Sequence, residues 1–346
     1  MINLKNDYSE GAHPLVLESI VHATFEQNDG YGYDIHCTNA ANELMRQIHN
    51  ENADIHFFLG GTAVNKTVIS SILKPWQAVI CANTGHINVH ETGAIESTGH
   101  KVLAAKSRDG KVTPEGIRQV VLEHTDEHMV KPAMVYISNS TEIGSIYKKQ
   151  ELEEIRKVCD EYQLYLYLDG ARLSNALACE KNDITLEDIA KLTDIFYLGG
   201  TKNGALAAEA CVILNEALKP QFRYAIKQNG AMASKGFLLG LQFEALLKDK
   251  LYLALAKHAN EMAQKLVEVI KKYHYPFLST PMTNQIFPIV PNEIYEKLKN
   301  EVLFEVWGKK DSEHTIVRFV TSWATKAEQI EAFDKIFMEI HGGNEK

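Results

Sequence analysis

Two short apolar runs, each ending in charged residues, constrain the fold of this chain more than any other feature. They are Tyr165–Leu168 and Ile195–Leu198, and both have the pattern of a buried strand. Asp169 and Arg172 follow the first run, and Lys202 follows the second. In an α/β fold, residues just beyond the carboxyl ends of parallel strands line the ligand crevice. The three charged side chains are therefore expected to converge at one edge of a sheet.

An acid and a lysine brought together in this way suit pyridoxal 5'-phosphate (PLP). The lysine amine can form a Schiff base, and the acid can pair with the pyridinium nitrogen. Glycines around Lys202 would leave room for a flat ring to approach the backbone. Taken alone, Lys202 is better explained as a solvated loop charge and Asp169 as a helix cap. The prediction of a PLP site therefore depends on the pairing of the two.

A regular alternation of strand and helix patterns runs through most of the chain. It predicts an α/β fold with a mostly parallel sheet between helices, preceded by an extended arm over residues 1–13. This large domain is expected to span residues 14–236. Over residues 237–346, two long helical stretches, short strands and a final helix predict a smaller α+β domain. The length of 346 residues suits two such domains.

A small turn, Gly60-Gly61-Thr62, separates an apolar run at residues 55–59 from a helical pattern. This arrangement places backbone N–H groups and a helix dipole against a phosphate, and Thr62 can cap the helix. The motifs GxxxxGK[ST] and GxGxxG are absent, which weakens the ATP and dinucleotide interpretations. A tight turn with a threonine cap is the simpler alternative.

Three more polar residues lie at or within predicted strands. His86 follows the strand at 78–81, where its ring could lie flat on a cofactor, although a lone loop histidine is more often an ordinary polar residue. Glu142 follows the strong strand at 132–138. Arg318 interrupts the apolar strand IVRFV, where it could grip a carboxylate or form a structural ion pair.

Composition limits the classes of function. The net charge of −9 argues against nucleic acid as the main partner. The N-terminus has no apolar signal core and no run approaches the length of a membrane span, so a cytoplasmic protein with no membrane association is expected. Five scattered cysteines without a CxxC pair predict buried reduced thiols, not disulfides or a metal site.

The motifs, taken in order, resemble the L-threonine aldolase / β-eliminating lyase family of PLP-dependent enzymes, which have the aspartate-aminotransferase-type fold (fold type I). The matching stretches are the opening NDYSEGAHP, FLGGTAVN, TGHINVHETG, LDGARLSNA, GGTKNGA and TIVRFVT, and they span nearly the whole chain. The resemblance implies a seven-stranded, mostly parallel sheet in the large domain and PLP as the cofactor.

The resemblance also implies roles around the cofactor. Lys202 would be the Schiff-base lysine, and Asp169 would hold the pyridinium nitrogen protonated. His86 would stack on the ring, and Gly61 and Thr62 would bind the phosphate.

A second group of residues would hold the substrate or complete the site across a subunit interface. Arg172 and Arg318 would surround the ring hydroxyl and the substrate carboxylate, and the arm residue Asn6 would lie near the substrate. Tyr31 would approach the site of a neighbouring subunit, and Lys235 would reach the phosphate there. The resemblance therefore implies a homodimer or a homotetramer.

The implied reaction is cleavage of the Cα–Cβ bond of L-threonine or L-allo-threonine to glycine and acetaldehyde, with His86 as one candidate base. The chain departs from the family at Glu142, where many members have a histidine in an N-T-H-N-G stretch, and at Asn6, where serine is usual. A carboxylate at 142 can still accept the hydroxyl proton. Two alternatives stay open: β-elimination or other α-carbon chemistry on a different amino acid, and a non-catalytic PLP-binding regulatory protein.

Overall fold

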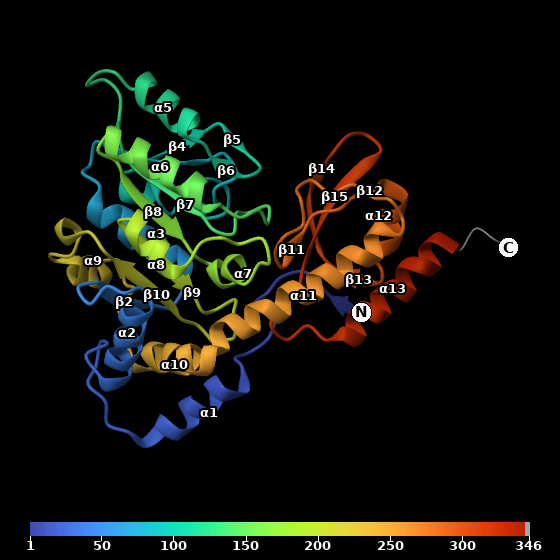
Figure 1. The fold of residues 1–346 in the computed structure, drawn as a ribbon, viewed down its shortest axis with the longest axis horizontal. Coiled ribbons are helices and arrows are strands. Elements are labelled where there is room, and N and C mark those ends of the chain that lie inside the picture. The colour runs from blue at the N-terminus through green and yellow to red at the C-terminus, as the bar shows by residue number, and fades with distance from the viewer. Residues whose placement is uncertain (343–346) are drawn as a thin grey trace.

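The computed structural model describes residues 1–342, which form a large sheet covered by helices and a smaller sheet beside it (Figure 1). The large sheet has seven strands, as predicted. Across the sheet their order is β2 (Asp54–Phe58), β10 (Glu209–Ile213), β9 (Ile195–Gly199), β8 (Tyr165–Asp169), β7 (Lys131–Ser138), β3 (Gln77–Ala82) and β4 (Lys101–Ala105).

Most of this sheet is parallel, which confirms the predicted architecture. β9, β8, β7, β3 and β4 pair in parallel along one continuous path. β10 is the exception, because it runs antiparallel to both β2 and β9. Its register places Glu209 opposite Gly199, so the first residue of β10 lies at the edge where the parallel strands end. That edge carries the candidate site.

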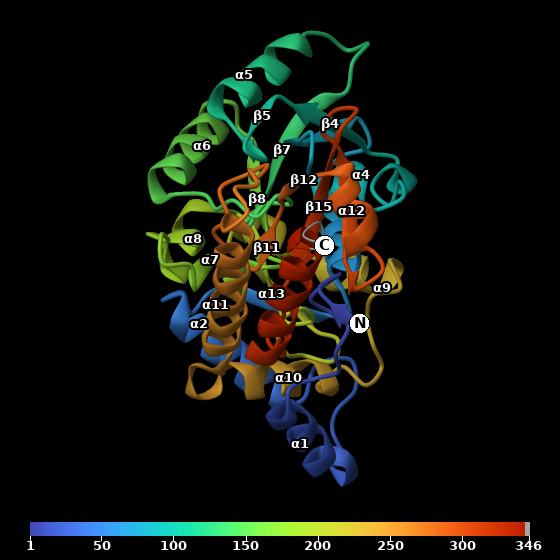
Figure 2. The same ribbon diagram turned by 90° about the vertical axis from the view of Figure 1, so that its right-hand side faces the viewer.

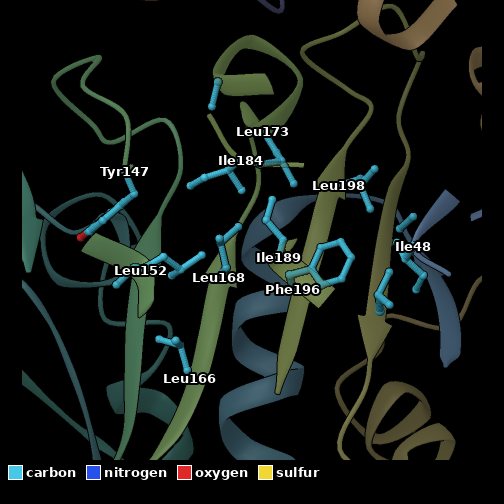
Figure 3. Packing of buried hydrophobic residues seen from close by; sticks show 14 of the residues in the cluster. Ile48, Tyr147, Leu152, Leu166, Leu168, Leu173, Ile184, Ile189, Phe196 and Leu198 are labelled. Atoms are coloured by element: carbon cyan, nitrogen blue, oxygen red, sulfur yellow. The ribbon is translucent and has the colours of Figure 1, made fainter. Parts of the chain in front are cut away.

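Alternate residues of the central strands face two different hydrophobic clusters, as expected for a sheet covered on both faces. In one cluster, Leu166 and Leu168 of β8 pack with Phe196 of β9. In the other, Tyr167 and Tyr197 from the same two strands pack together. Figure 3 shows part of the first cluster. These runs look continuously apolar in sequence because both faces of the sheet are buried.

Helices and 3-10 turns cover the large sheet. Those from the first half of the chain are α1 (Pro14–His22), η1 (Ala23–Phe25), α2 (Ile35–Gln47), α3 (Gly61–Ile72), α4 (His86–Val89), η2 (Glu96–Thr98), α5 (Pro114–Glu123) and α6 (Lys149–Glu161). Those from the second half are α7 (Leu173–Leu177), α8 (Leu186–Leu192), η3 (Glu216–Leu218), α9 (Phe222–Gln228), α10 (Phe237–Leu247) and η4 (Lys248–Lys250). A two-stranded ribbon joins β5 (Ser107–Arg108) to β6 (Lys111–Val112).

The second, smaller sheet lies at the far end of α11 (Leu251–Lys271), which runs from α10 towards it (Figure 1). Its strands are β11 (Gln285–Ile286), β12 (Ile289–Pro291), β14 (Glu305–Lys309) and β15 (His314–Val320), and α12 (Asn292–Leu298) and α13 (Ala327–Gly342) accompany them. Phe287 and Pro288 separate β11 from β12. Proline has no N–H to donate to a ladder.

The N-terminal arm is joined to this smaller part of the molecule. β1 (Ile2–Asn3) pairs in parallel with β13 (Val302–Leu303), and it also contacts α13, as Figure 2 shows from the side of the small sheet. At the other boundary, α10 packs against α2 and α1 beside the large sheet. The division of the chain near Gly236 stays a prediction.

The turn after β8 depends on a close approach between two backbones. A Cβ atom added at Gly170 would lie 1.8 Å from the carbonyl oxygen of Tyr197, which cannot move without disturbing β9. We therefore expect Gly170→Ala to lower the free energy of unfolding by about 3 kcal/mol, measured by urea denaturation. Gly11→Ala is the matched control, because a Cβ there meets no atom within 4 Å. Equal stability of the two variants would contradict this account.

Within residues 1–342, no helix combines the length and the apolar character that crossing a membrane would require. All five cysteines are buried and free, as predicted.

Candidate active site

A cavity of about 220 Å³ opens at the edge of the large sheet where the parallel strands end. It brings together residues that are far apart in the sequence. The predicted site residues on its wall are Gly61, Thr62, His86, Glu142, Asp169, Arg172 and Lys202. The expected convergence of the two strand ends around Asp169 and Lys202 is therefore present.

Asp169, the last residue of β8, is the most heavily hydrogen-bonded carboxylate in the cavity. Its Oδ1 accepts hydrogen bonds from the Tyr197 hydroxyl at 2.6 Å and from the Ala171 N–H at 2.9 Å. Its Oδ2 accepts from the Tyr136 hydroxyl at 2.5 Å and from Asn65 Nδ2 at 3.1 Å. Four donors therefore act on this one carboxylate. They also hold both oxygens at the cavity wall.

Lys202 lies in the turn between β9 and β10 and is half-buried. Burial lowers the pKa of its ammonium group, and the nearby guanidinium of Arg172 lowers it further, whereas the carboxylates of Asp7 and Asp169 oppose the shift. A lysine whose pKa is lowered has more of the neutral, nucleophilic amine at neutral pH.

Glu209 is a cavity residue that the sequence did not identify. Its Oε2 accepts a hydrogen bond from the Gly200 N–H at 3.0 Å, and this bond stabilises the turn that contains Lys202. Burial raises the pKa of Glu209 to about 7, against the opposing effects of a hydrogen bond from Thr201 and the charge of Lys202. The only sequence signal was a charged residue at the start of an apolar strand.

The Gly-Gly-Thr turn forms the start of α3. The helix begins at Gly61, and Gly60 is the N-cap, with no side-chain hydrogen bond. The predicted cap role of Thr62 is therefore wrong, because Thr62 already lies within the first turn. A Cβ at Gly61 would lie 2.8 Å from the Tyr197 hydroxyl, so only glycine allows this approach. The helix N-terminus faces the cavity, where its dipole favours an anion.

His86 and Glu142 lie side by side on another wall of the cavity. His86 begins α4, and its backbone N–H donates to Glu142 Oε1 at 2.9 Å. The same Oε1 accepts from the Ser138 hydroxyl at 2.6 Å. Burial raises the pKa of Glu142, although these hydrogen bonds oppose the shift. His86 Nδ1 lies 2.8 Å from Glu91 Oε1, a contact that the sequence did not suggest.

Arg172 makes a two-pronged ion pair with Asp7 of the N-terminal arm. Its Nε and Nη2 donate to Asp7 Oδ2 and Oδ1 at 2.6 and 3.0 Å. Asn284, next to β11, also donates to Asp7, at 2.9 Å. Burial disfavours the Asp7 carboxylate, but the charges of Arg172 and Lys202 outweigh it and hold its pKa below the usual value. This pair links the arm, the large sheet and the small sheet.

Arg318 is paired within the small sheet and does not line the cavity. It donates to Glu305 of β14, and its guanidinium lies 5.7 Å from the centre of the Trp307 ring. Burial lowers the pKa of Arg318, and the charge of Arg172 adds to the effect. The structural ion pair considered from the sequence is therefore present, while a role in substrate binding stays a prediction.

Three other predicted residues lie outside this cavity. Asn6 uses its Oδ1 to accept hydrogen bonds from the backbone of Tyr8 and the hydroxyl of Ser9 within the arm. Tyr31 and Lys235 occupy neighbouring segments, since the Tyr31 N–H donates to the Ser234 carbonyl at 3.1 Å. The structure places Tyr31 beside a separate cavity of about 710 Å³.

The sequence matches the β-eliminating lyase family over residues 11–293. The chain belongs to this family. It is also similar to the low specificity L-threonine aldolases of a Pseudomonas species (strain NCIMB 10558) and of Pseudomonas aeruginosa. The identities are 33% and 31%, and each alignment covers 94% of both proteins.

Solved structures agree with the assignment to the β-eliminating lyases. A threonine aldolase from Leishmania major superposes with a TM-score of 0.97 at 44% identity, covering 98% of this chain and 99% of that one. An aspartate aminotransferase from Thermus thermophilus, at 14% identity, superposes with a TM-score of 0.74 and covers 98% and 91% of the two chains. The latter likeness shows the fold, which is the predicted aspartate-aminotransferase type.

Members of the β-eliminating lyase family are PLP-dependent enzymes. The chemistry of the cavity wall fits that cofactor. It offers a half-buried lysine with a lowered pKa, a carboxylate held by four donors, and a glycine-lined helix N-terminus. Among residues 1–342, no group of three or more His, Cys, Asp or Glu is arranged to hold a metal ion.

Proposed function

We propose that this protein is a PLP-dependent L-threonine aldolase of low specificity. It would cleave L-threonine, L-allo-threonine and related β-hydroxy-amino acids to glycine and an aldehyde. The observation that carries the proposal is the meeting of Lys202, Asp169 and the start of α3 around one cavity. The similarity of the whole chain to low specificity threonine aldolases supports the choice of substrate class.

Five residues would hold the cofactor. Lys202 would bind it covalently, Asp169 would pair with its ring nitrogen, and Gly61 and Thr62 would hold its phosphate at the start of α3. His86 would lie against the ring. When bound, PLP withdraws electrons from the α-carbon of an amino acid, which makes bonds to that carbon easier to break.

The chain's own groups would orient the substrate and move its protons. Arg172 Nε and Nη2 hold Asp7, and Nη1, which makes no hydrogen bond within residues 1–342, would bind the substrate carboxylate. Arg318 would provide a second cation. Glu142 or His86 would take the β-hydroxyl proton as the carbonyl of the aldehyde forms and the Cα–Cβ bond breaks. The α-carbon then takes a proton, and glycine leaves.

We propose further that the active unit is a homodimer or homotetramer. Tyr31 and Lys235 lie away from the cavity of their own chain, on neighbouring segments that are joined by a backbone hydrogen bond. In the assembly they would reach the cavity of a partner, with Lys235 at the phosphate. Asn6 would remain close to the substrate through the arm.

A product assay tests this function. Protein loaded with PLP is incubated with L-threonine, and acetaldehyde, glycine, ammonia and 2-oxobutyrate are measured together. We expect acetaldehyde and glycine in equal amounts. Ammonia with 2-oxobutyrate would indicate β-elimination, which the replacement of the usual histidine by Glu142 keeps as the second candidate. If PLP-loaded protein forms neither pair of products, threonine is ruled out as the substrate.

Glu142 can be tested separately from cofactor binding. Glutamine would preserve the acceptor for His86 N–H and Ser138 but could not take a proton, so we expect Glu142→Gln to lower kcat roughly 100-fold with PLP affinity unchanged. Burial raises the pKa of Glu142, so its protonated form persists to higher pH than that of an ordinary glutamate. The carboxylate that can take the proton forms only as pH rises through this raised pKa. In the wild type, kcat/KM should therefore increase with pH on the acid side of its pH profile. In Glu142→Gln this increase should be absent.

Glu180→Gln, at an exposed position, provides the control for Glu142→Gln. It should keep both the rate and the pH profile of the wild type. An unchanged acid limb in Glu142→Gln would assign the proton transfer to another group, with His86 the next candidate.

A further inference from the structure

Glu91 is a buried carboxylate for which the proposed function has no role. Its side chain is 0% exposed, and it lies just beyond α4. Its Oε1 lies 2.8 Å from His86 Nδ1 and accepts from Asn65 Nδ2 at 2.7 Å. Its Oε2 has no hydrogen-bond partner within residues 1–342. A carboxylate buried with so few partners is costly unless a neighbouring group compensates its charge.

Asn65 fixes the arrangement from the other side. Its Nδ2 donates both to Glu91 Oε1 and to Asp169 Oδ2, at 2.7 and 3.1 Å, and its Oδ1 accepts from the Tyr167 hydroxyl at 2.6 Å. The reversed amide would place an oxygen against two carboxylates, so the chemistry of the partners decides its orientation. One amide group therefore ties Glu91 to Asp169.

This contact determines which nitrogen of His86 carries a proton. An ionised carboxylate only accepts, so Nδ1 must donate to Glu91, and Nε2 is the nitrogen that remains for another partner. The His86 side chain is 37% exposed, on the wall of the cavity.

We propose that Glu91 is a positioning residue for His86. It holds Nδ1 as the donor and so fixes the orientation of the ring, while Asn65 holds Glu91 in place beside Asp169. The inference rests on the proposed function at one point, namely that His86 lies against the cofactor ring. The pairing itself is a property of the chain's own residues.

Other titratable groups also act on His86. The His90 ring centre lies 5.7 Å from that of His86, and Glu142 accepts from the His86 backbone N–H. Asp169 and Lys202 line the same cavity. None of these is hydrogen-bonded to the imidazole in the described part of the chain, so Glu91 should have the largest effect on its titration.

Histidine titration by NMR tests the proposal on the full-length protein with PLP bound. Ring-labelled histidine is used, and the His86 signal is assigned by its loss in His86→Asn. We expect Glu91→Gln, which keeps the shape and removes the charge, to lower the His86 midpoint by about 1 pH unit or more. Glu96→Gln removes an exposed carboxylate nearby and should leave the midpoint unchanged. An unmoved midpoint in Glu91→Gln, or an equal shift in both variants, overturns the proposal.

A second variant gives a shift of opposite sign. Asn65→Ala removes the donor shared by Glu91 and Asp169, which concentrates the negative charge of Glu91 on His86, so the midpoint should rise. General disruption of the site would not shift the His86 midpoint in opposite directions in the two variants. If Glu91→Gln does not fold, Asn65→Ala alone tests the proposal. An unchanged His86 midpoint in Asn65→Ala then overturns it.

The same samples separate this inference from the proposed function. Wild-type protein that binds PLP and cleaves threonine, with His86 titrating identically in the variants, overturns the role of Glu91 alone. Wild-type protein that yields no aldehyde, with His86 shifting as expected, contradicts the aldolase proposal and leaves the pairing intact.

Discussion

Replacing Lys202 with alanine is expected to abolish threonine cleavage and the visible absorbance of protein-bound PLP. The side chain is half-buried, and the pKa of its amine is lowered by this burial and by Arg172, which favours the nucleophilic form at neutral pH. Alanine removes the covalent attachment altogether. We expect kcat/KM to fall by at least about 1,000-fold, as it does when a covalent nucleophile is removed from other enzymes.

The measurements for this variant are a PLP absorbance spectrum after removal of free cofactor and the rate of acetaldehyde release. Lys181→Ala, an exposed lysine outside the cavity, should retain both. Circular dichroism establishes that the Lys202 variant is folded. Wild-type absorbance in folded Lys202→Ala protein would show that another residue binds the cofactor and would contradict the site assignment.

The largest effect on stability is expected at Asp7. Its side chain is 0% exposed, and that of its partner Arg172 is 11% exposed. Asp7→Asn leaves the guanidinium buried without a compensating charge, which costs about 3–5 kcal/mol in comparable pairs. Since Asn284 also loses an anionic acceptor, the arm and the small sheet should loosen together. Urea denaturation measures the change in the free energy of unfolding.

The effect of Asp7→Asn should also depend on pH in a defined direction. The folded-state pKa of Asp7 lies below its usual value, so its contribution is fully present above the unfolded pKa of about 4. It is lost as pH falls through the lower, folded-state value. The difference between wild type and Asp7→Asn should therefore be constant from neutral pH down to about 4 and shrink below it.

Glu161→Gln is the control for Asp7→Asn. It breaks the exposed pair between Arg118 and Glu161, whose side chains are 40% and 49% exposed. Pairs of this kind contribute about 0.2–1 kcal/mol. If Asp7→Asn lowers the free energy of unfolding no more than Glu161→Gln does, the buried pair stabilises the protein little more than an exposed ion pair.

The charges around the cavity should make the site sensitive to single substitutions. Asp7, Asp169 and Glu209 surround Lys202 and Arg172 in a buried region, where interactions between charges are weakly screened. Removing one member changes the protonation of the others. Effects measured in single variants of this group should not be summed, because the groups are in contact or share partners.

Local sequence patterns predicted the strands that carry the chemistry. The runs before Asp169 and Lys202 form β8 and β9, and the two residues do meet at one cavity. Such runs are readable because a strand covered on both faces is continuously apolar. A helix end was less well predicted, because Thr62 does not cap α3.

The sequence by itself therefore determined the fold class and the two strand ends, through apolar periodicity, and it identified the acid, the lysine and the glycine turn through local motifs. Only the tertiary structure decided which charges pair. Asp7 meets Arg172 across 165 positions of the chain, and Asn65 meets Asp169 across 104. Periodicity is a local property, whereas the pairing of a buried charge depends on which distant segment lies within about 3 Å of it. The partnerships of Asp7, Glu91 and Glu209 therefore became visible only in the folded chain.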